Sequence, residues 1–219
     1  DLVCEELRNR IIDGELPPGG RLVERDLAEE LDVSRIVIRE AIQQLVAENL
    51  VVLVARRGAQ VASMDEQDVV DLFEVRLNLE VLAVRCAAER RTDDDLARLQ
   101  RLIDAARRAT ADGDIRAASD LNLEFHFALA DVSRNQVLAS ILQSLAGPVR
   151  RVFRIAQDTR PQYLISDHIE ILDAIRTGDA ERAGRLAYDH IEATREPALA
   201  RIRSGSAPAT TDRRTSPLR

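Results

Sequence analysis

The chain has three histidines, and each lies in a stretch that reads as an amphipathic helix: His126, His168 and His190. Histidine is the commonest metal ligand in proteins, and one imidazole from each of three neighbouring helices could converge on a single ion. Three unrelated histidines in the core or on the surface, each hydrogen-bonded on its own, would show the same spacing. The residues alone leave both interpretations open.

The helices that carry these residues must pack together for a shared site to form. Asn122 and His126 are four residues apart, so both side chains project from one face of a helix. His168 and His190 lie in the last two predicted helices. Gly178 would end the first of these and Asp179 would cap the second, so the tight turn between them predicts antiparallel neighbours.

Length and composition favour an all-helical protein with no membrane span. The 219 residues suit one large domain or two modest ones, and 45% of them are apolar but only 3% aromatic. No apolar run approaches the roughly 20 residues of a membrane-spanning helix. Cys4 and Cys86 match no metal-ligand spacing, so we interpret them as reduced thiols of a cytoplasmic protein.

The charge pattern gives two contrary indications about nucleic acid. The net charge of −7 argues against it, but all 31 basic residues are arginine. Arginine presents a fixed fork of donors suited to phosphates and guanine edges. A GC-rich genome would produce the same bias toward arginine, so composition alone does not decide.

Residues 1–63 read as helix, helix, turn, helix and hairpin. The predicted elements are a helix ending at Gly14, a loop over 16–22, a helix over 24–31, a helix from the cap Ser34 to about Asn49, and two strands within 50–63 around Arg56-Arg57-Gly58. This order is that of a winged helix-turn-helix, in which a supported helix enters the major groove and the hairpin reaches the DNA backbone or minor groove.

Residues 64–203 read as a second domain of about six helices, so the fold class is mainly α. Ser63 and Glu66 have capping-box spacing and begin a helix to about Arg90. Further helices are predicted over about 93–111, 114–132, 136–157, 161–177 and 179–203. Residues 204–219 are small, polar and proline-containing, and we expect a disordered tail there.

Both segments, taken in order, resemble the GntR superfamily of bacterial transcription regulators, specifically its FadR subfamily with an FCD effector domain. The stretches that carry the resemblance are GELPPGGRLVERDLAEELDVSRIVIREAIQQLVAENLV, RRGAQV, FEVRLNLE, NLEFHFALAD and DHIEILDAIRTGDAERAGRLAYDHI. The six-helix count looks more like the VanR branch than the seven-helix FadR branch. Two departures are Ile36-Val37 where the family usually has Thr-Pro, and Asn49 where it usually has glycine.

The resemblance implies which residues contact operator DNA. Arg25, Arg35, Arg39 and Gly58 match family contact positions, and we add Ser34, Ile36 and Arg57 from their places on the predicted recognition helix and wing. Arg35 and Arg39 are one helical turn apart and suit guanine or phosphate contacts, while Ile36 suits a thymine methyl. Against this interpretation, residues 1–63 hold 8 Arg and 12 Asp plus Glu, a net charge of 8 − 12 = −4.

The resemblance also implies a metal and an effector. In the family an Asp and three His bind a divalent metal, and Asn122, His126, His168 and His190 match those positions, with Asn122 in place of the Asp. Zn, Ni, Fe or Mn would suit three imidazoles. Arg76 matches a position that engages a carboxylate effector, although an ion pair with Glu80 four residues on is an alternative role for it.

The expected function is therefore a ligand-responsive regulator and not an enzyme. We expect a homodimer on a palindromic operator, most simply a repressor relieved by a small organic acid. The alternative is a three-histidine metalloenzyme acting on such an acid, since open metal sites of this kind also catalyse hydrolysis. Against it, the sequence offers no convincing general base: Glu124 lies two residues from His126, off that face.

Overall fold

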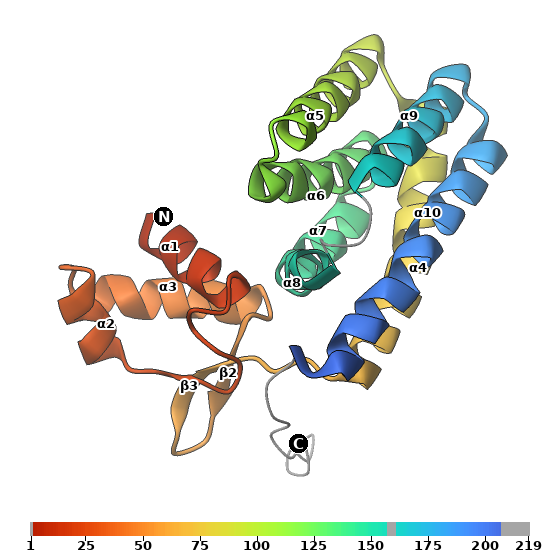
Figure 1. Cartoon of the computed structure of the whole chain (residues 1–219). Coiled ribbons are helices and arrows are strands. Elements are labelled where there is room, and N and C mark those ends of the chain that lie inside the picture. Colours follow the sequence, from red (N-terminus) through yellow and green to blue (C-terminus); the bar gives the residue numbers. More distant parts are fainter. Residues whose placement is uncertain (1, 157–160, 207–219) are drawn as a thin grey trace.

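The computed structural model describes residues 2–156 and 161–206 and divides into a winged part and a helical part (Figure 1). The winged part contains α1 (Leu2–Ile12), β1 (Arg21–Leu22), α2 (Glu24–Glu30), α3 (Arg35–Ala47), β2 (Val51–Val54) and β3 (Gly58–Val61). Leu7, Ile38 and Leu45 form the centre of its core and are fully buried. The predicted order of helices, turn and hairpin is confirmed.

Two local features shape the exposed ends of α3 and of the hairpin. Ser34 caps α3 by accepting a hydrogen bond from Val37 N at 3.4 Å, as its residue type predicts. The three strands pair antiparallel in the order β1-β3-β2, and the hairpin pairs Val54 with Gly58. Arg56 and Gly58 have φ values of 64° and 80°, and such left-handed residues close the tight turn at the wing tip.

The helical part contains seven α-helices among the residues described, not the six predicted. They are α4 (Glu66–Arg90), α5 (Asp93–Ala111), α6 (Ile115–Val132), α7 (Gln136–Ser144), α8 (Ala146–Ala156), α9 (Pro161–Thr177) and α10 (Ala180–Arg201). The long helices α4 and α10 run side by side, and α5, α6 and α9 complete the bundle (Figure 1). The predicted mainly α fold class is confirmed.

The predicted helix over 136–157 is interrupted at Leu145, which separates α7 from α8. Pro148 has no N–H to donate to the carbonyl of Ser144, so that oxygen is free for another partner. Asn49 Nδ2, from the end of α3, donates to it at 2.9 Å. The helix count therefore gives no reason to prefer the six-helix branch over the seven-helix branch.

The boundaries of the first and last helices also differ from the prediction. Asp65, not Ser63, caps α4, because Asp65 and Asp68 form a reciprocal capping box with both hydrogen bonds at 2.9 Å. At the other end α10 passes into a short π-helical segment, η2 (Ile202–Ser206). The rest of the predicted disordered tail, residues 207–219, lies outside the described residues.

Among the helices described, none combines the length and apolar character that a bilayer crossing requires.

Candidate functional site

The three histidines converge in the interior of the helical part. His126 from α6, His168 from α9 and His190 from α10 are 8%, 3% and 4% exposed. One ring nitrogen from each lies within 4.8 Å of the other two, and the Nε2 atoms of His168 and His190 are 3.2 Å apart. The interpretation of three unrelated histidines is therefore wrong: they form one cluster.

The turn between α9 and α10 brings two of these histidines together. Gly178 adopts a φ of 76°, and Asp179 caps α10 by accepting a hydrogen bond from Arg182 N at 2.9 Å. The two helices consequently fold back on each other, as their sequence predicts. Asn122 and His126 occupy one face of α6. The helix α6 also packs against α4.

Two carboxylates contact the far nitrogens of the cluster. Glu80 Oε2 lies 2.8 Å from His126 Nδ1, and Asp167 Oδ2 lies 3.1 Å from His190 Nδ1. A carboxylate at Nδ1 favours the tautomer that presents Nε2 as a lone-pair donor. The sequence indicates Glu80 only as a possible ion-pair partner of Arg76, because its contact with His126 joins α4 to α6 and has no signal in the spacing along the chain.

Apart from Glu80 Oε2, whose contact is the ion pair with His126, three buried polar side-chain atoms of the site residues have no hydrogen-bond partner among the described residues: His126 Nε2, Asn122 Oδ1 and Arg76 Nη1. Buried polar atoms are nearly always satisfied, so a cluster of unsatisfied ones indicates a missing ligand. Imidazole nitrogens and an amide oxygen are donors that a borderline transition metal accepts. The three imidazoles present therefore fit a divalent metal ion, and the Asn122 carbonyl oxygen, one helical turn before His126, is a candidate fourth ligand without charge.

The protonation states also suit a cation. Burial, together with the neighbouring histidines, lowers the pKa of His168, and burial lowers the pKa of His190 against the opposing effect of Asp167. Burial alone would raise the pKa of the Glu80 carboxyl, but the charge of Arg76 and the hydrogen bonds from His126 and Arg76 outweigh it and hold that pKa well below its usual value. His168 and His190 are thus neutral near pH 7, while Glu80 is ionised.

Arg76 is 1% exposed, and its Nε donates to Glu80 Oε1 at 2.6 Å. The intramolecular pair that the sequence left as an alternative is therefore present. The guanidinium is also sandwiched between Phe73 and Phe153, whose ring centres lie 5.0 and 4.8 Å from its carbon. Nη1 remains without a partner among the described residues, so the pair with Glu80 leaves donors for an anion.

A small cavity adjoins the cluster, with room for about one water molecule. Its polar lining is Glu80, His126 and His190, and the remainder is aliphatic: Ala83, Val84, Leu129, Ile171, Ala187 and Ile191. An organic acid is larger than this space, so any such ligand requires the surrounding helices to move apart.

The candidate DNA-contacting residues gather at the exposed ends of α2, α3 and the wing. The side chains of Arg25, Arg35 and Arg39 are 78%, 63% and 57% exposed. Ile36 is 66% exposed, so its side chain is accessible to a base edge. The other candidates, Ser34, Arg57 and Gly58, are exposed as well.

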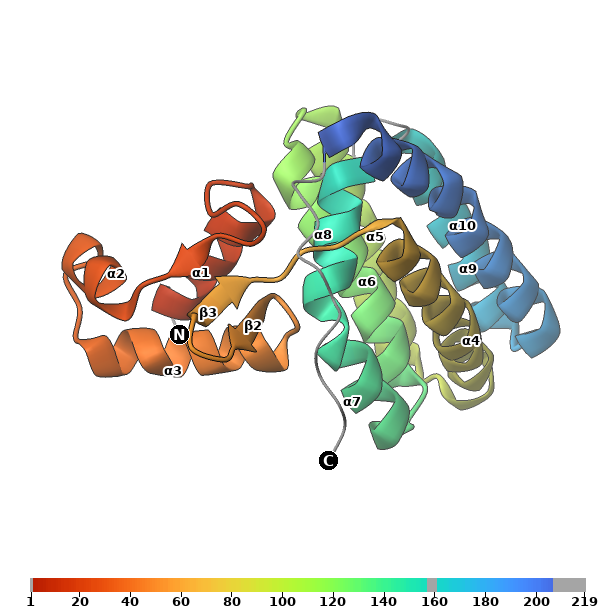
Figure 2. The ribbon, with the colours of Figure 1, turned by 90° about the horizontal axis from the view of Figure 1, so that it is seen from below.

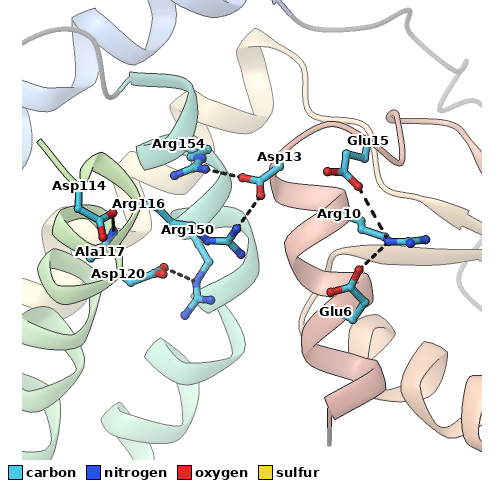
Figure 3. A network of polar contacts seen from close by, with 10 residues as sticks. All are labelled: Glu6, Arg10, Asp13, Glu15, Asp114, Arg116, Ala117, Asp120, Arg150 and Arg154. Atoms are coloured by element: carbon cyan, nitrogen blue, oxygen red, sulfur yellow. Dashed lines mark hydrogen bonds and ion pairs between the residues drawn. The ribbon is translucent and has the colours of Figure 1, made fainter. Parts of the chain in front are cut away.

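The winged part docks on the helical part through α8 and α6. Asp13, just after α1, accepts contacts from Arg154 at 2.6 Å and from Arg116 at 3.2 Å (Figure 3). Arg151 Nη1 donates to the carbonyl of Ala62 in the connection between the two parts. Figure 2 shows α8 on the side of the helical part that faces the winged part. The same helix carries Phe153, so α8 contacts both the histidine site and the winged part.

The comparisons with known proteins agree with both parts of the structure. Residues 1–61 match the family model described as bacterial regulatory proteins, gntR family, and residues 71–193 match the FCD domain. The transcriptional regulator LutR of Bacillus subtilis is 31% identical over 204 residues, which cover 83% of this chain and 92% of LutR. The galactonate operon transcriptional repressor of Escherichia coli is 27% identical, with 87% of this chain and 93% of that protein covered.

A solved structure matches over nearly the whole chain. It is the crystal structure of a putative GntR transcriptional regulator from Rhodococcus sp. RHA1, with a TM-score of 0.73 and 31% identity over 93% of this chain and 96% of that one. The matched domains and relatives are those of transcription regulators, which excludes the metalloenzyme alternative.

Proposed function

The chain belongs to the gntR family of bacterial regulatory proteins and carries an FCD effector domain, and from this premise we propose that it is a metal-dependent repressor released by a small carboxylate. Regulation of transcription follows from the family. The metal, the class of effector and the sign of regulation are the proposal, and the cluster of unsatisfied buried atoms around three histidines is the observation that carries it.

We assign the metal to His126, His168 and His190, with Asn122 Oδ1 as the fourth ligand. The ion would be Zn, Ni, Fe or Mn, since all four accept imidazole. When bound, it supplies a Lewis-acidic position for a carboxylate oxygen. Glu80 and Asp167 act on the ligand histidines, holding each ring so that Nε2 faces the centre of the cluster.

We assign the effector to the same centre. Arg76 offers Nη1, a buried donor that a carboxylate would satisfy with a charge-assisted hydrogen bond. The name of one relative refers to galactonate, itself a carboxylate, which supports this class of ligand. Because the Phe153 ring packs over the Arg76 guanidinium, a carboxylate that reaches Arg76 Nη1 would displace Phe153 and with it α8.

The winged part would bind a palindromic operator as part of a homodimer, with α3 in the major groove. We assign base contacts to Arg35, Ile36 and Arg39, and backbone contacts to Arg25, Ser34, Arg57 and Gly58. Movement of α8 would change the orientation of the winged part through Asp13 and Ala62, and so change operator affinity.

Elemental analysis of untagged protein, purified without chelator, tests the metal assignment. The wild type is expected to hold close to one divalent ion per chain, and His126→Ala is expected to lose it. Glu124→Ala, an exposed position on the same helix, is the matched control and should retain the ion. Absence of metal from the wild type would overturn the proposal and leave three histidines that bind an anion directly.

A panel of small carboxylates then tests the effector assignment. A carboxylate that raises the melting temperature of the wild type and releases it from DNA should have no effect on Arg76→Met, whose metal content must be unchanged. A response retained in Arg76→Met would remove Arg76 from the effector site.

A further inference from the structure

The guanidinium of Arg39 is held in place by a carboxylate of the preceding helix. Arg39 Nε donates to Glu24 Oε1 at 3.0 Å, and Arg39 Nη2 donates to Glu24 Oε2 at 2.8 Å, so the contact is bidentate. Arg35 Nη2 lies 3.5 Å from the same Oε2. One carboxylate at the start of α2 therefore restrains both arginines at the start of α3.

The contact leaves the end of the arginine fork free. A guanidinium has five N–H donors. Glu24 uses the one on Nε and one on Nη2, so both donors on Nη1 and the second donor on Nη2 remain. Two parallel donors at the end of an arginine fork match O6 and N7 of guanine in the major groove. An arginine whose Nε and one Nη2 donor are bound by Glu24 can therefore still donate from Nη1 and Nη2 to a guanine.

Neither folding nor overall DNA affinity accounts for this pair. The side chains of Arg39 and Glu24 are 57% and 28% exposed, and exposed ion pairs contribute little to stability. A carboxylate beside a DNA-facing surface repels phosphates, which weakens binding to every sequence alike. The remaining effect is orientation, because a long flexible side chain loses less entropy on binding when it is already restrained.

We propose that Glu24 is a specificity-determining residue, which orients Arg39 toward a guanine edge in preference to the nearest phosphate. The inference rests on the proposed function, in which α3 enters the major groove. Glu24 would then influence which operator the protein prefers without contacting a DNA base itself.

The test selects the full-length protein's preferred site from a pool of duplexes with randomised central positions. The guanine that Arg39 contacts is identified as the operator position at which Arg39→Ala has a preference for guanine roughly tenfold or more weaker than that of the wild type. Glu24→Gln is expected to bind random duplexes more tightly than the wild type, yet to lose about threefold or more of its preference for that guanine over adenine. In the Arg39→Ala background, Glu24→Gln should leave the preference at that position unchanged.

Glu29→Gln is the matched control, because Glu29 is exposed on the same helix and its loss removes the same charge. It should raise affinity for random duplexes without altering the guanine preference. Full guanine preference in Glu24→Gln, or an equal loss in Glu29→Gln, would overturn the inference. If Arg39→Ala selects the same site as the wild type, the placement of α3 itself fails, which is a different outcome from a failure at Glu24 alone.

Discussion

Glu80 brings a negative charge to the wall of the histidine cluster, whose proposed fourth ligand, Asn122, is neutral. Its carboxylate is buried between Arg76 and His126, and both contacts are shorter than 3 Å. A carboxylate bound to a divalent ion would neutralise part of the ion's charge directly. Glu80 contacts His126, so its negative charge would act on the ion only through that imidazole. At the scale of single residues, the proposed metal would therefore be held less strongly than in a site with an aspartate at position 122.

Asn122→Asp should raise the affinity for a divalent metal, on the order of tenfold, because an anionic oxygen replaces a neutral one. The dissociation constant measured in competition with a chelator of known affinity provides the test. Asn78→Asp makes the same change at an exposed position of α4 and should leave the constant unchanged. An Asn122→Asp protein with unaltered affinity would show that this side chain does not reach the metal.

Acidification should destabilise the metal-free protein below about pH 6.5. The pKa values of His168 and His190 are lowered in the folded state, so the unfolded chain binds more protons. The corresponding stability is fully present above the unfolded pKa and is lost as the pH falls below it, by up to about 1.4 kcal/mol per pH unit for each histidine.

Melting temperatures between pH 7.5 and 5.5 would measure this loss. His168→Gln removes one of the two groups, so its profile should be flatter than that of the wild type. A His168→Gln profile as steep as the wild-type one would mean that other groups cause the acid sensitivity.

At the scale of elements, α3 depends on a single capping side chain. Ser34 Oγ accepts from Val37 N, and the first turn of α3 contains no acidic residue to stabilise it further. Ile36 and Val37 in the same turn are exposed to 66% and 37%, so burial stabilises this end of the helix only in part. The cap therefore has more effect on this helix end than it would on one buried against a neighbour.

Ser34→Ala should lower the free energy of unfolding of the winged part by about 1 kcal/mol. Ser34→Thr keeps the accepting oxygen and is the control. Urea denaturation followed by far-ultraviolet circular dichroism measures both variants, and equal stabilities of Ser34→Ala and Ser34→Thr would exclude a capping role.

At the scale of the whole molecule, α8 is the element that joins site and winged part. A β-carbon at Gly147 would overlap the backbone oxygen of Glu48 and lie 2.7 Å from Leu50 Cγ, so only glycine permits this approach of α8 to the end of α3. About two turns further along α8, Phe153 packs over Arg76. The next residue, Arg154, contacts Asp13 (Figure 3). A displacement at the histidine site therefore has a short physical path to the recognition helix.

Asp13→Ala should loosen the docking of the winged part, because Arg116 and Arg154 lose their common acceptor. We expect faster amide hydrogen exchange at residues 46–50 and 145–150, where the two parts touch. Asp120→Ala removes only a 3.8 Å contact with Arg150 inside the helical part and is the matched control. Unchanged exchange in Asp13→Ala would show that other contacts, such as Asn49 with Ser144, suffice to hold the parts together.

The sequence by itself determined most of the helices and strands and the candidate metal-ligating residues. Local rules identified the Ser34 cap. Asn49, at a position where the family usually has glycine, has a φ of 57°, a left-handed conformation that asparagine tolerates. Hydrophobic periodicity located the helices that carry the histidines, and the i, i+4 spacing placed Asn122 beside His126. These features depend on neighbours in the chain, which the sequence shows directly. The break at Leu145 escaped because apolar periodicity continues through it, although Pro148 was a signal.

Only the tertiary structure decided which groups meet. Glu80, His126 and His190 come from α4, α6 and α10, and their spacing in the sequence does not predict that their side chains lie together. The capture of Arg39 by Glu24 and the approach of Gly147 to Glu48 likewise join residues from different helices. Such contacts are set by how whole helices pack, and packing is a collective property of many side chains that no local pattern encodes.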